Sequence, residues 1–284
     1  MEHNLGFHCH RVRQIEERIL ANELARGEFY HFPADELPSL KREIRAHHLA
    51  ASIHCPLLKP PWYPEPPTWA FLCDVDREKR ELNVRMVRET LEMAGDIEAE
   101  YVVVHFPSPS FTDSSGRGYD EMRAIALESG HRLATLSEHY GVPIYIEGFG
   151  PSPLLSAEFL VEVLTLFPAL RYCFDTGHMN IAAARDGFDL YRFAEQVAPY
   201  VGAVHLWNSR GWEDYACFHH IPVHPSQDPV EGWADIARIL STIAQGRPQL
   251  PMVFESPTWY PQALGDHDYR DGVTWVRELL ETLS

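Results

Sequence analysis

Histidine, aspartate and glutamate recur at one kind of position along this chain, the carboxyl end of a short apolar run. Six runs end in such a residue, at His54, His105, Glu147, Asp175, His205 and Glu255. Imidazole and carboxylate groups bind divalent cations, and they also transfer protons near neutral pH. Because no CxxC pair accompanies them, thiolate ligation is not indicated. The residue types predict a divalent cofactor such as Mn²⁺, Zn²⁺, Mg²⁺ or Co²⁺, without deciding between these ions.

The elements that must carry these residues follow from the apolar pattern. Several stretches have the three- and four-residue spacing of amphipathic helices, at 12–27, 34–48, 76–96, 121–141 and 155–167. Eight short apolar runs are predicted strands, at Leu5–His8, Phe29–His31, Ala50–Cys55, Tyr101–His105, Pro143–Glu147, Arg171–Asp175, Val201–Leu206 and Met252–Glu255. This alternation, without a Gly-rich phosphate motif, predicts an α/β protein with a single (β/α)₈ TIM barrel spanning residues 1–284.

In such a barrel the carboxyl ends of the strands surround one axial pocket. Glu147 and Glu255 would otherwise be buried carboxylates without an obvious basic partner, which is costly, so a shared cation is the favoured interpretation. Two long connections, at 56–74 with its repeated prolines and at 208–231, are predicted to be irregular loops over this end. Trp62, Trp207 and Arg210 are candidate substrate contacts, although the tryptophans could equally be packing residues.

Composition restricts the partners. The chain of 284 residues carries 41 acidic and 24 basic side chains, a formal net charge of −17, which disfavours nucleic acid and anionic membranes as ligands. No apolar run approaches the ~20 residues that span a bilayer, and the first residues do not resemble a signal peptide, so we expect a cytoplasmic protein. The five cysteines are scattered and predict no disulfide framework. Exposed loop aromatics leave a homo-oligomer open.

The strand ends IHCP, VVVHF, YIEGFG, CFDTGH, AVHLWNS and VFESP resemble those of the xylose isomerase-like and endonuclease IV-like superfamily of divalent-metal TIM barrels. In its sugar epimerase branch the resemblance implies one metal held by Glu147, Asp175, His205 and Glu255. It also implies that Glu147 and Glu255 transfer a proton beside the substrate carbonyl through a metal-stabilised enediolate, and that His178 contacts substrate. The leading expectation is an isomerase or epimerase of a small sugar or polyhydroxy carbonyl compound.

The endonuclease branch of the same superfamily adds further metal ligands. His54, His105 and His178 match them, and His220 matches the histidine of an Asp-x-His pair whose acidic position is occupied by Phe218. The alternative function is therefore a multi-zinc phosphodiesterase that acts on abasic DNA, and more than one metal stays open. The missing carboxylate and the charge of −17 count against this alternative.

Structural interpretations remain open for the same residues. His54 and His105 could be hydrogen-bonded barrel histidines, and Asp175 could cap the following helix. His8, His10 and His31 lie on the first two predicted strands, where they could contact substrate or support the metal ligands. A third hypothesis is a barrel that binds metal without catalysis.

Overall fold

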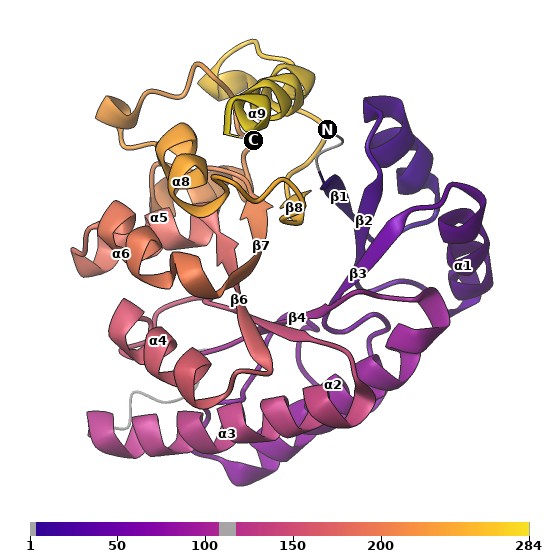
Figure 1. The fold of residues 1–284 in the computed structure, drawn as a ribbon, viewed down its shortest axis with the longest axis vertical. Helices are drawn as coiled ribbons and strands as arrows, with labels where there is room; N and C mark the ends of the chain where they lie inside the picture. The colour runs from indigo at the N-terminus through magenta and orange to yellow at the C-terminus, as the bar shows by residue number, and fades with distance from the viewer. Residues whose placement is uncertain (1–3, 108–117, 284) are drawn as a thin grey trace.

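A computed structural model describes residues 4–107 and 118–283 of the chain. Parallel strands pair in sequence order, and β8 returns to β1 to close the barrel, with helices around the outside (Figure 1). The strands are β1 (Leu5–Cys9), β2 (Arg26–Phe29), β3 (Ala50–His54), β4 (Val102–His105), β5 (Ile144–Glu147), β6 (Leu170–Asp175), β7 (Val201–Leu206) and β8 (Met252–Phe254). The predicted TIM barrel is confirmed.

Helices and short helical turns connect the strands. The α-helices are α1 (Leu37–Ala46), α2 (Arg77–Ala94), α3 (Tyr119–Tyr140), α4 (Ala157–Leu166), α5 (Thr176–Asp186), α6 (Leu190–Val197), α7 (Trp212–Phe218), α8 (Ile236–Ile243) and α9 (Tyr269–Leu283). The short turns are η1 (Ile15–Ile19), η2 (Leu20–Asn22), η3 (Ala34–Glu36), η4 (Gly95–Ile97), η5 (Ala198–Tyr200), η6 (Pro229–Glu231) and η7 (Gln262–Leu264). No helix in the described ranges is long and apolar enough to cross a membrane.

Successive side chains along each strand point alternately to the helices outside the barrel and to the barrel interior, where the candidate site residues lie. On β5, Ile144 and Ile146 belong to the apolar layer beneath the helices, whereas Tyr145 packs with the small cluster inside the barrel. Glu147 follows two positions after Tyr145, so its side chain also faces the barrel interior. The same period places Asp175 on β6 and His205 on β7 inside the barrel, where they are paired neighbours.

Three predicted elements differ from the observed ones. The expected helix over 12–27 is replaced by the π-helical turn η1 and the turn η2, and the irregular segment 208–231 contains α7. The second strand covers Arg26–Phe29 instead of Phe29–His31. Its inward residues, Arg26 and Glu28, are charged and buried. The apolar pattern therefore begins only at Phe29, and the predicted strand starts too late in the chain.

The proline-rich connection after β3 agrees with its prediction. Residues 56–74, all of which are described, contain neither helix nor strand. Tyr63 and Phe71 from this segment are buried in the apolar core, and the carbonyl oxygen of Thr68 accepts a hydrogen bond from His105 Nδ1 at 2.8 Å. The loop thus packs over the carboxyl end of the barrel and contacts one of the residues there.

Candidate metal centre and pocket

Four strands bring Glu147, Asp175, His205 and Glu255 together. One donor atom from each lies within 4.8 Å of the others. His205 Nδ1 lies 3.2 Å from Glu255 Oε2, 3.5 Å from Glu147 Oε1 and 3.8 Å from Asp175 Oδ2. Around an ion with bonds of about 2.1 Å, neighbouring ligand atoms lie roughly 3.0–3.4 Å apart. The four donors therefore need only small movements to surround one divalent cation.

The bonding of the donor atoms also fits a cation. Glu147 Oε1, His205 Nδ1 and Glu255 Oε2 are buried and have no hydrogen-bond partner among the described residues. Such atoms are expensive to bury unless something compensates them. The mixed imidazole and carboxylate set suits Mn²⁺, Zn²⁺, Co²⁺ or Mg²⁺. The residues present fit a metal of this class.

The electrostatics of the cluster are strongly coupled. Burial disfavours the charged form of His205, but Cys173 and the carboxylates of Glu28, Glu147 and Glu255 outweigh it and raise the pKa of His205 well above its ordinary value. Burial opposes ionisation of Glu147 and Glu255 too, yet His205 holds the pKa of both carboxyls well below their usual range. For Asp175, burial and the charge of Glu147 raise the pKa. A protonated His205 thus occupies the place of the cation when no metal is bound.

Asp175 has a second role beside its place in the cluster. Its Oδ1 accepts a hydrogen bond from the His178 backbone N–H at 2.6 Å and so caps α5. Its Oδ2 accepts one from Trp207 Nε1 at 2.7 Å. A Cβ on Gly177 would lie 2.3 Å from the Trp207 ring, so the glycine after Thr176 permits this contact. The capping and metal interpretations of Asp175 are compatible, since the carboxylate serves both.

Glu28 on β2 is a site residue that the sequence analysis missed. Its side chain is fully buried, and its Oε1 lies 2.8 Å from His205 Nε2, on the opposite side of the imidazole ring from the cluster. Ser52 Oγ donates a hydrogen bond to Glu28 Oε2 at 3.0 Å. Glu28 Oε1 and His205 Nε2 do not form an aligned hydrogen bond, but the negative charge so close to Nε2 favours a proton on that nitrogen and leaves Nδ1 to bind metal.

A second group of donors adjoins the first. His54 Nε2 and His105 Nε2 lie 3.2 and 3.6 Å from Glu147 Oε2, whereas Glu147 Oε1 faces His205. The other ring nitrogens of His54 and His105 face the carbonyl oxygens of Cys55 and Thr68. Both Nε2 atoms face the Glu147 carboxylate, and these three residues also could hold a metal ion. The same contacts also fit a purely structural role, in which His54 and His105 are hydrogen-bonded histidines of the barrel.

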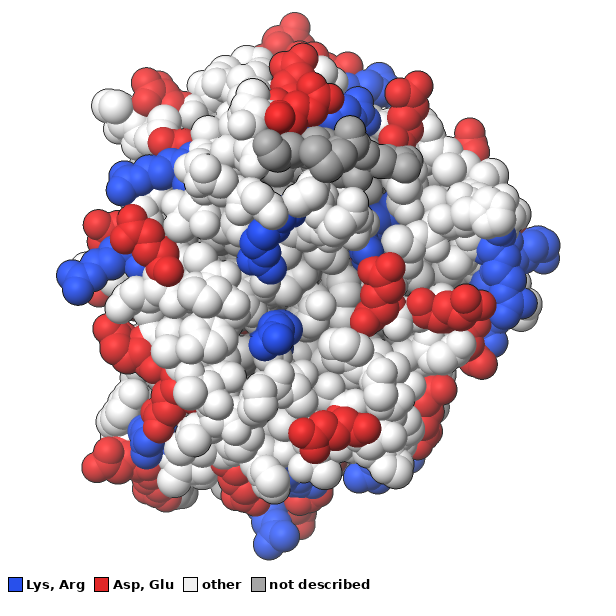
Figure 2. Space-filling view, in the orientation of Figure 1, with Lys and Arg blue, Asp and Glu red and all other residues white. Residues whose placement is uncertain are grey.

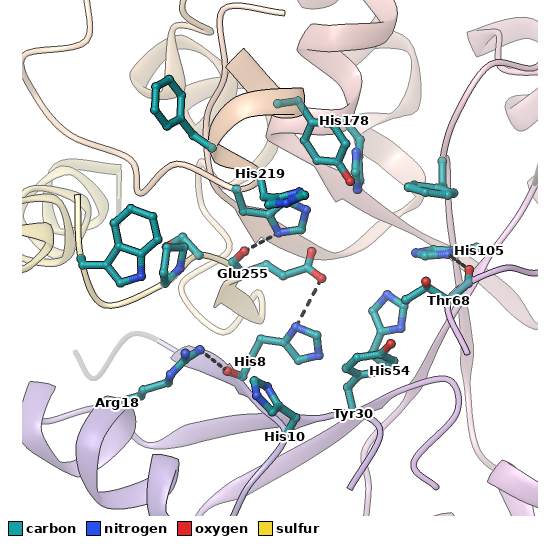
Figure 3. Close-up of a pocket in the computed structure, with 17 residues that line it drawn as sticks. His8, His10, Arg18, Tyr30, His54, Thr68, His105, His178, His219 and Glu255 are labelled. Atoms are coloured by element: carbon teal, nitrogen blue, oxygen red, sulfur yellow. Dashed lines mark hydrogen bonds and ion pairs between the residues drawn. The ribbon is translucent and has the colours of Figure 1, made fainter. Parts of the chain in front are cut away.

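A cavity of about 420 Å³ opens above these groups. Figure 3 shows Glu255 near the centre of the lining residues, with His54 and His105 to its right and His178 above them. His220 also lines the cavity and donates a hydrogen bond from Nδ1 to the carbonyl oxygen of Glu255 at 2.6 Å. Burial lowers the pKa of His178 to about 3 and that of His105 to about 4. These histidines are neutral hydrogen-bonding groups at neutral pH.

Three expected substrate contacts lie outside the lining of this cavity. Trp62 donates from Nε1 to Glu89, and the Arg85 guanidinium lies over its ring. Arg210 forms an ion pair with Asp214 at 2.6 Å, which satisfies its charge away from the pocket. Trp207 is fully buried, stacks on His220 and contacts Asp175. Packing and pairing account for all three side chains.

Several residues of the cavity wall were not predicted. The aromatic members are Tyr30, Phe149, Tyr215 and Phe218, and the basic member is Arg18, whereas Trp259, which also lines the cavity, is one of the loop tryptophans that could stack on a sugar ring. His8 lies among them with Nδ1 3.3 Å from Glu255 Oε1, as expected for a group that supports a metal ligand. His31, by contrast, is absent from the lining. The inward register of β1, with Gly6 and His8 on alternate positions, is the sequence signal that places His8 here.

Charges elsewhere are dispersed. On the face drawn in Figure 2, lysines and arginines are interspersed with acidic side chains and form no continuous basic track among the described residues. A nucleic-acid backbone is gripped by such a track. None of the five cysteines, all within the described ranges, forms a disulfide.

Comparisons with known proteins place the chain in a family. Its fold resembles a D-tagatose 3-epimerase-like protein (16% identity, TM-score 0.72, 99% of this chain and 98% of the other) and an L-ribulose 3-epimerase (18%, 0.71, 100% and 96%). A 3-keto-D-glucoside 4-epimerase from E. coli is similar as well (14%, 0.69, 97% and 99%). A search of curated proteins gave no significant match. The sequence matches the xylose isomerase-like TIM barrel family over residues 15–279, and the chain belongs to this family.

Proposed function

We propose that this protein is a divalent-metal-dependent isomerase or epimerase of a small sugar or polyhydroxy carbonyl compound. The observation that carries the proposal is the convergence of unpartnered donor atoms from Glu147, His205 and Glu255, with Asp175, in a buried cluster whose member Glu255 lines a cavity. A cavity of about 420 Å³ has the volume of a small-molecule site. The sugar epimerases among the structural neighbours support the same class.

The proposed reaction moves a proton at the carbon beside a carbonyl. When bound, the metal would polarise the substrate oxygens and so acidify this C–H bond. Glu255 is the proposed base, because it lines the cavity and is held between His8 and His205. Glu147 lies deeper and is the candidate for returning the proton from the other side. His178 would donate or accept a hydrogen bond with a substrate hydroxyl.

Two measurements test the proposal. Elemental analysis of the purified protein should give about one divalent metal per chain. A panel of ketopentoses and ketohexoses, incubated with the protein in D₂O, should then show deuterium at the carbon next to the carbonyl of at least one sugar, by NMR. Removal of the metal with a chelator should stop the exchange, and its return should restore it. Sugars that bind without any exchange would favour a metal-binding barrel without catalysis.

A multi-metal phosphodiesterase is the second candidate. The group formed by His54, His105 and Glu147 favours it, because a second ion beside the first would suit the cleavage of a phosphodiester. Phe218 lines the cavity at the position where that branch has an acid, so a third metal would lack one ligand. About three zinc ions per chain, together with cleavage of abasic DNA, would favour the phosphodiesterase over the isomerase or epimerase.

A further inference from the structure

The cavity contains one cationic side chain of the lysine and arginine type. Among the described residues, only Arg18 of this kind belongs to the lining, which otherwise consists largely of aromatic rings and histidines. Arg18 lies on the π-helical turn η1, which directs it toward the cavity near His8 and His10 (Figure 3). Single π-helical turns are common at functional sites.

The bonding of Arg18 is incomplete. Its Nη1 donates to the carbonyl oxygen of His8 at 3.0 Å, and no carboxylate in the described part of the chain forms an ion pair with it. Most other arginines in this acidic chain have such a partner, as Arg210 does in Asp214 and Arg132 in Glu81. A guanidinium carries five N–H donors. Arg18 therefore retains donors and an uncompensated charge at the cavity wall.

His8 connects Arg18 with the metal centre. Its carbonyl oxygen accepts from Arg18, while its ring nitrogen Nδ1 lies 3.3 Å from Glu255 Oε1. Arg18 and the proposed base Glu255 thus contact the same residue, His8, one at its backbone and the other at its ring. A ligand with one end at Glu255 can reach the guanidinium with the other end.

His10, the cavity histidine drawn beside Arg18, adds no positive charge there. Burial, with the nearby His8 and Arg18, lowers the pKa of His10 to about 4, so His10 is neutral at pH 7. A neutral imidazole can add a hydrogen bond but no charge. Arg18 is thus the one arginine or lysine of the described lining that can bind an anion, and a guanidinium matches the two oxygens of a carboxylate or a phosphate.

We propose that the substrate of this site carries an anionic terminal group, a carboxylate or a phosphate, which Arg18 holds at the end remote from the metal centre. The reaction at the other end rests on the proposed function, but the recognition does not. The proposal narrows the substrate class to sugar acids or sugar phosphates.

Equilibrium binding of three unreactive polyols tests this recognition. Glucitol, gluconate and glucitol 6-phosphate differ at one terminal group, and calorimetry on the metal-loaded protein measures their Kd. We expect either anion to bind about ten- to a hundred-fold more tightly than glucitol, as for a hydrogen bond to a charged group. The variant Arg18→Gln should remove this preference and leave the glucitol Kd unchanged.

Matched variants control for folding and for general charge. Arg13→Gln removes an exposed arginine that precedes the same turn and does not line the cavity, so it should bind all three polyols as the wild type does. Arg18→Lys keeps the positive charge but loses the paired N–H donors of the guanidinium, so it should retain part of the preference for the anionic polyols. An effect of Arg18→Gln on gluconate alone assigns the anion as a carboxylate, and an effect on the phosphate ester alone assigns it as a phosphate.

Equal binding of the three polyols by the wild type would overturn the proposal. So would an anion preference that persists in Arg18→Gln, because the anion would then bind the metal. These results are independent of the reaction. Deuterium exchange into neutral sugars without any anion preference would refute only this inference, whereas Arg18-dependent binding without exchange into sugar acids or phosphates would refute only the proposed function.

Discussion

Glu28 and His205 form a buried pair in which the carboxylate lies 2.8 Å from the imidazole Nε2. Neither side chain is exposed. Glu28 is oriented by Ser52, and the second nitrogen of His205 faces Glu147, Asp175 and Glu255. Strand β2 thus supplies a carboxylate that can orient the imidazole of the candidate metal ligand His205.

The variant Glu28→Gln should weaken metal binding about ten- to a hundred-fold, as is typical when the carboxylate behind a metal-binding histidine is lost. The neutral amide lacks the charge that favours a proton on Nε2, so the tautomer with a lone pair on Nδ1 is less favoured. Competition with a chelating dye measures the affinity, and ¹⁵N NMR of the imidazole reports the tautomer. Glu195→Gln, an exposed substitution on α6, should change neither. Unaltered affinity and tautomer in Glu28→Gln would show that Glu28 only fills space.

Glu28 also shows where prediction from sequence ends. The barrel and the residues at the ends of β3 to β8 could be predicted, because apolar runs that finish in an acid or a histidine mark both the strand and its inner face. On β2 the inward residues Arg26 and Glu28 are charged, so the apolar run is interrupted and the strand was misplaced. Trp62 and Arg210, two predicted substrate contacts, lie outside the cavity lining for another reason. Their partners, Glu89 and Asp214, depend on tertiary packing or on a helix that the sequence did not indicate.

Metal affinity should rise with pH through the neutral range. The pKa of His205 is raised well above its ordinary value, so the metal-free protein holds a proton that the metal must displace. If one proton leaves, the affinity falls up to about ten-fold for each pH unit below the raised pKa. Calorimetry in buffers of different ionisation enthalpy counts the protons released. Binding with no proton release at pH 7 would contradict a protonated His205.

The raised pKa of His205 also determines how the stability of the metal-free protein changes with pH. A histidine whose folded pKa is raised stabilises the fold below its unfolded pKa, and this contribution is lost as the pH rises through the folded value. Added metal should therefore stabilise the protein most on the alkaline side. At a hundred times Kd, mass action alone adds about 2.7 kcal/mol to the free energy of unfolding. Thermal melts with and without metal at pH 6 and pH 9 measure the difference.

Gly177→Ala should disturb the metal centre through Trp207. The new Cβ would lie 2.3 Å from the indole, which must move away from Asp175. Overpacking of this kind costs typically 1–3 kcal/mol, which urea unfolding would measure, and metal affinity should fall at the same time. Gly95→Ala is the matched control, because a Cβ there meets nothing within 4 Å. Equal stability of the two variants would remove Gly177 from this role.

Glu255→Gln should reduce deuterium incorporation about 10²- to 10⁴-fold, the usual contribution of a positioned base. Glu255 is the cluster carboxylate that lines the cavity, and His205 holds its pKa low, so it is ionised in the metal-free site. Glutamine keeps one oxygen for the metal but cannot take the proton. Metal content must therefore be measured on the same sample, so that lost exchange is separated from lost metal. Glu147→Gln should impair the return of the proton, and it should slow epimer formation more than exchange. If Glu255→Gln, fully loaded with metal, exchanged at the wild-type rate, another group of the cavity wall, such as His8 or His178, would have to be the base.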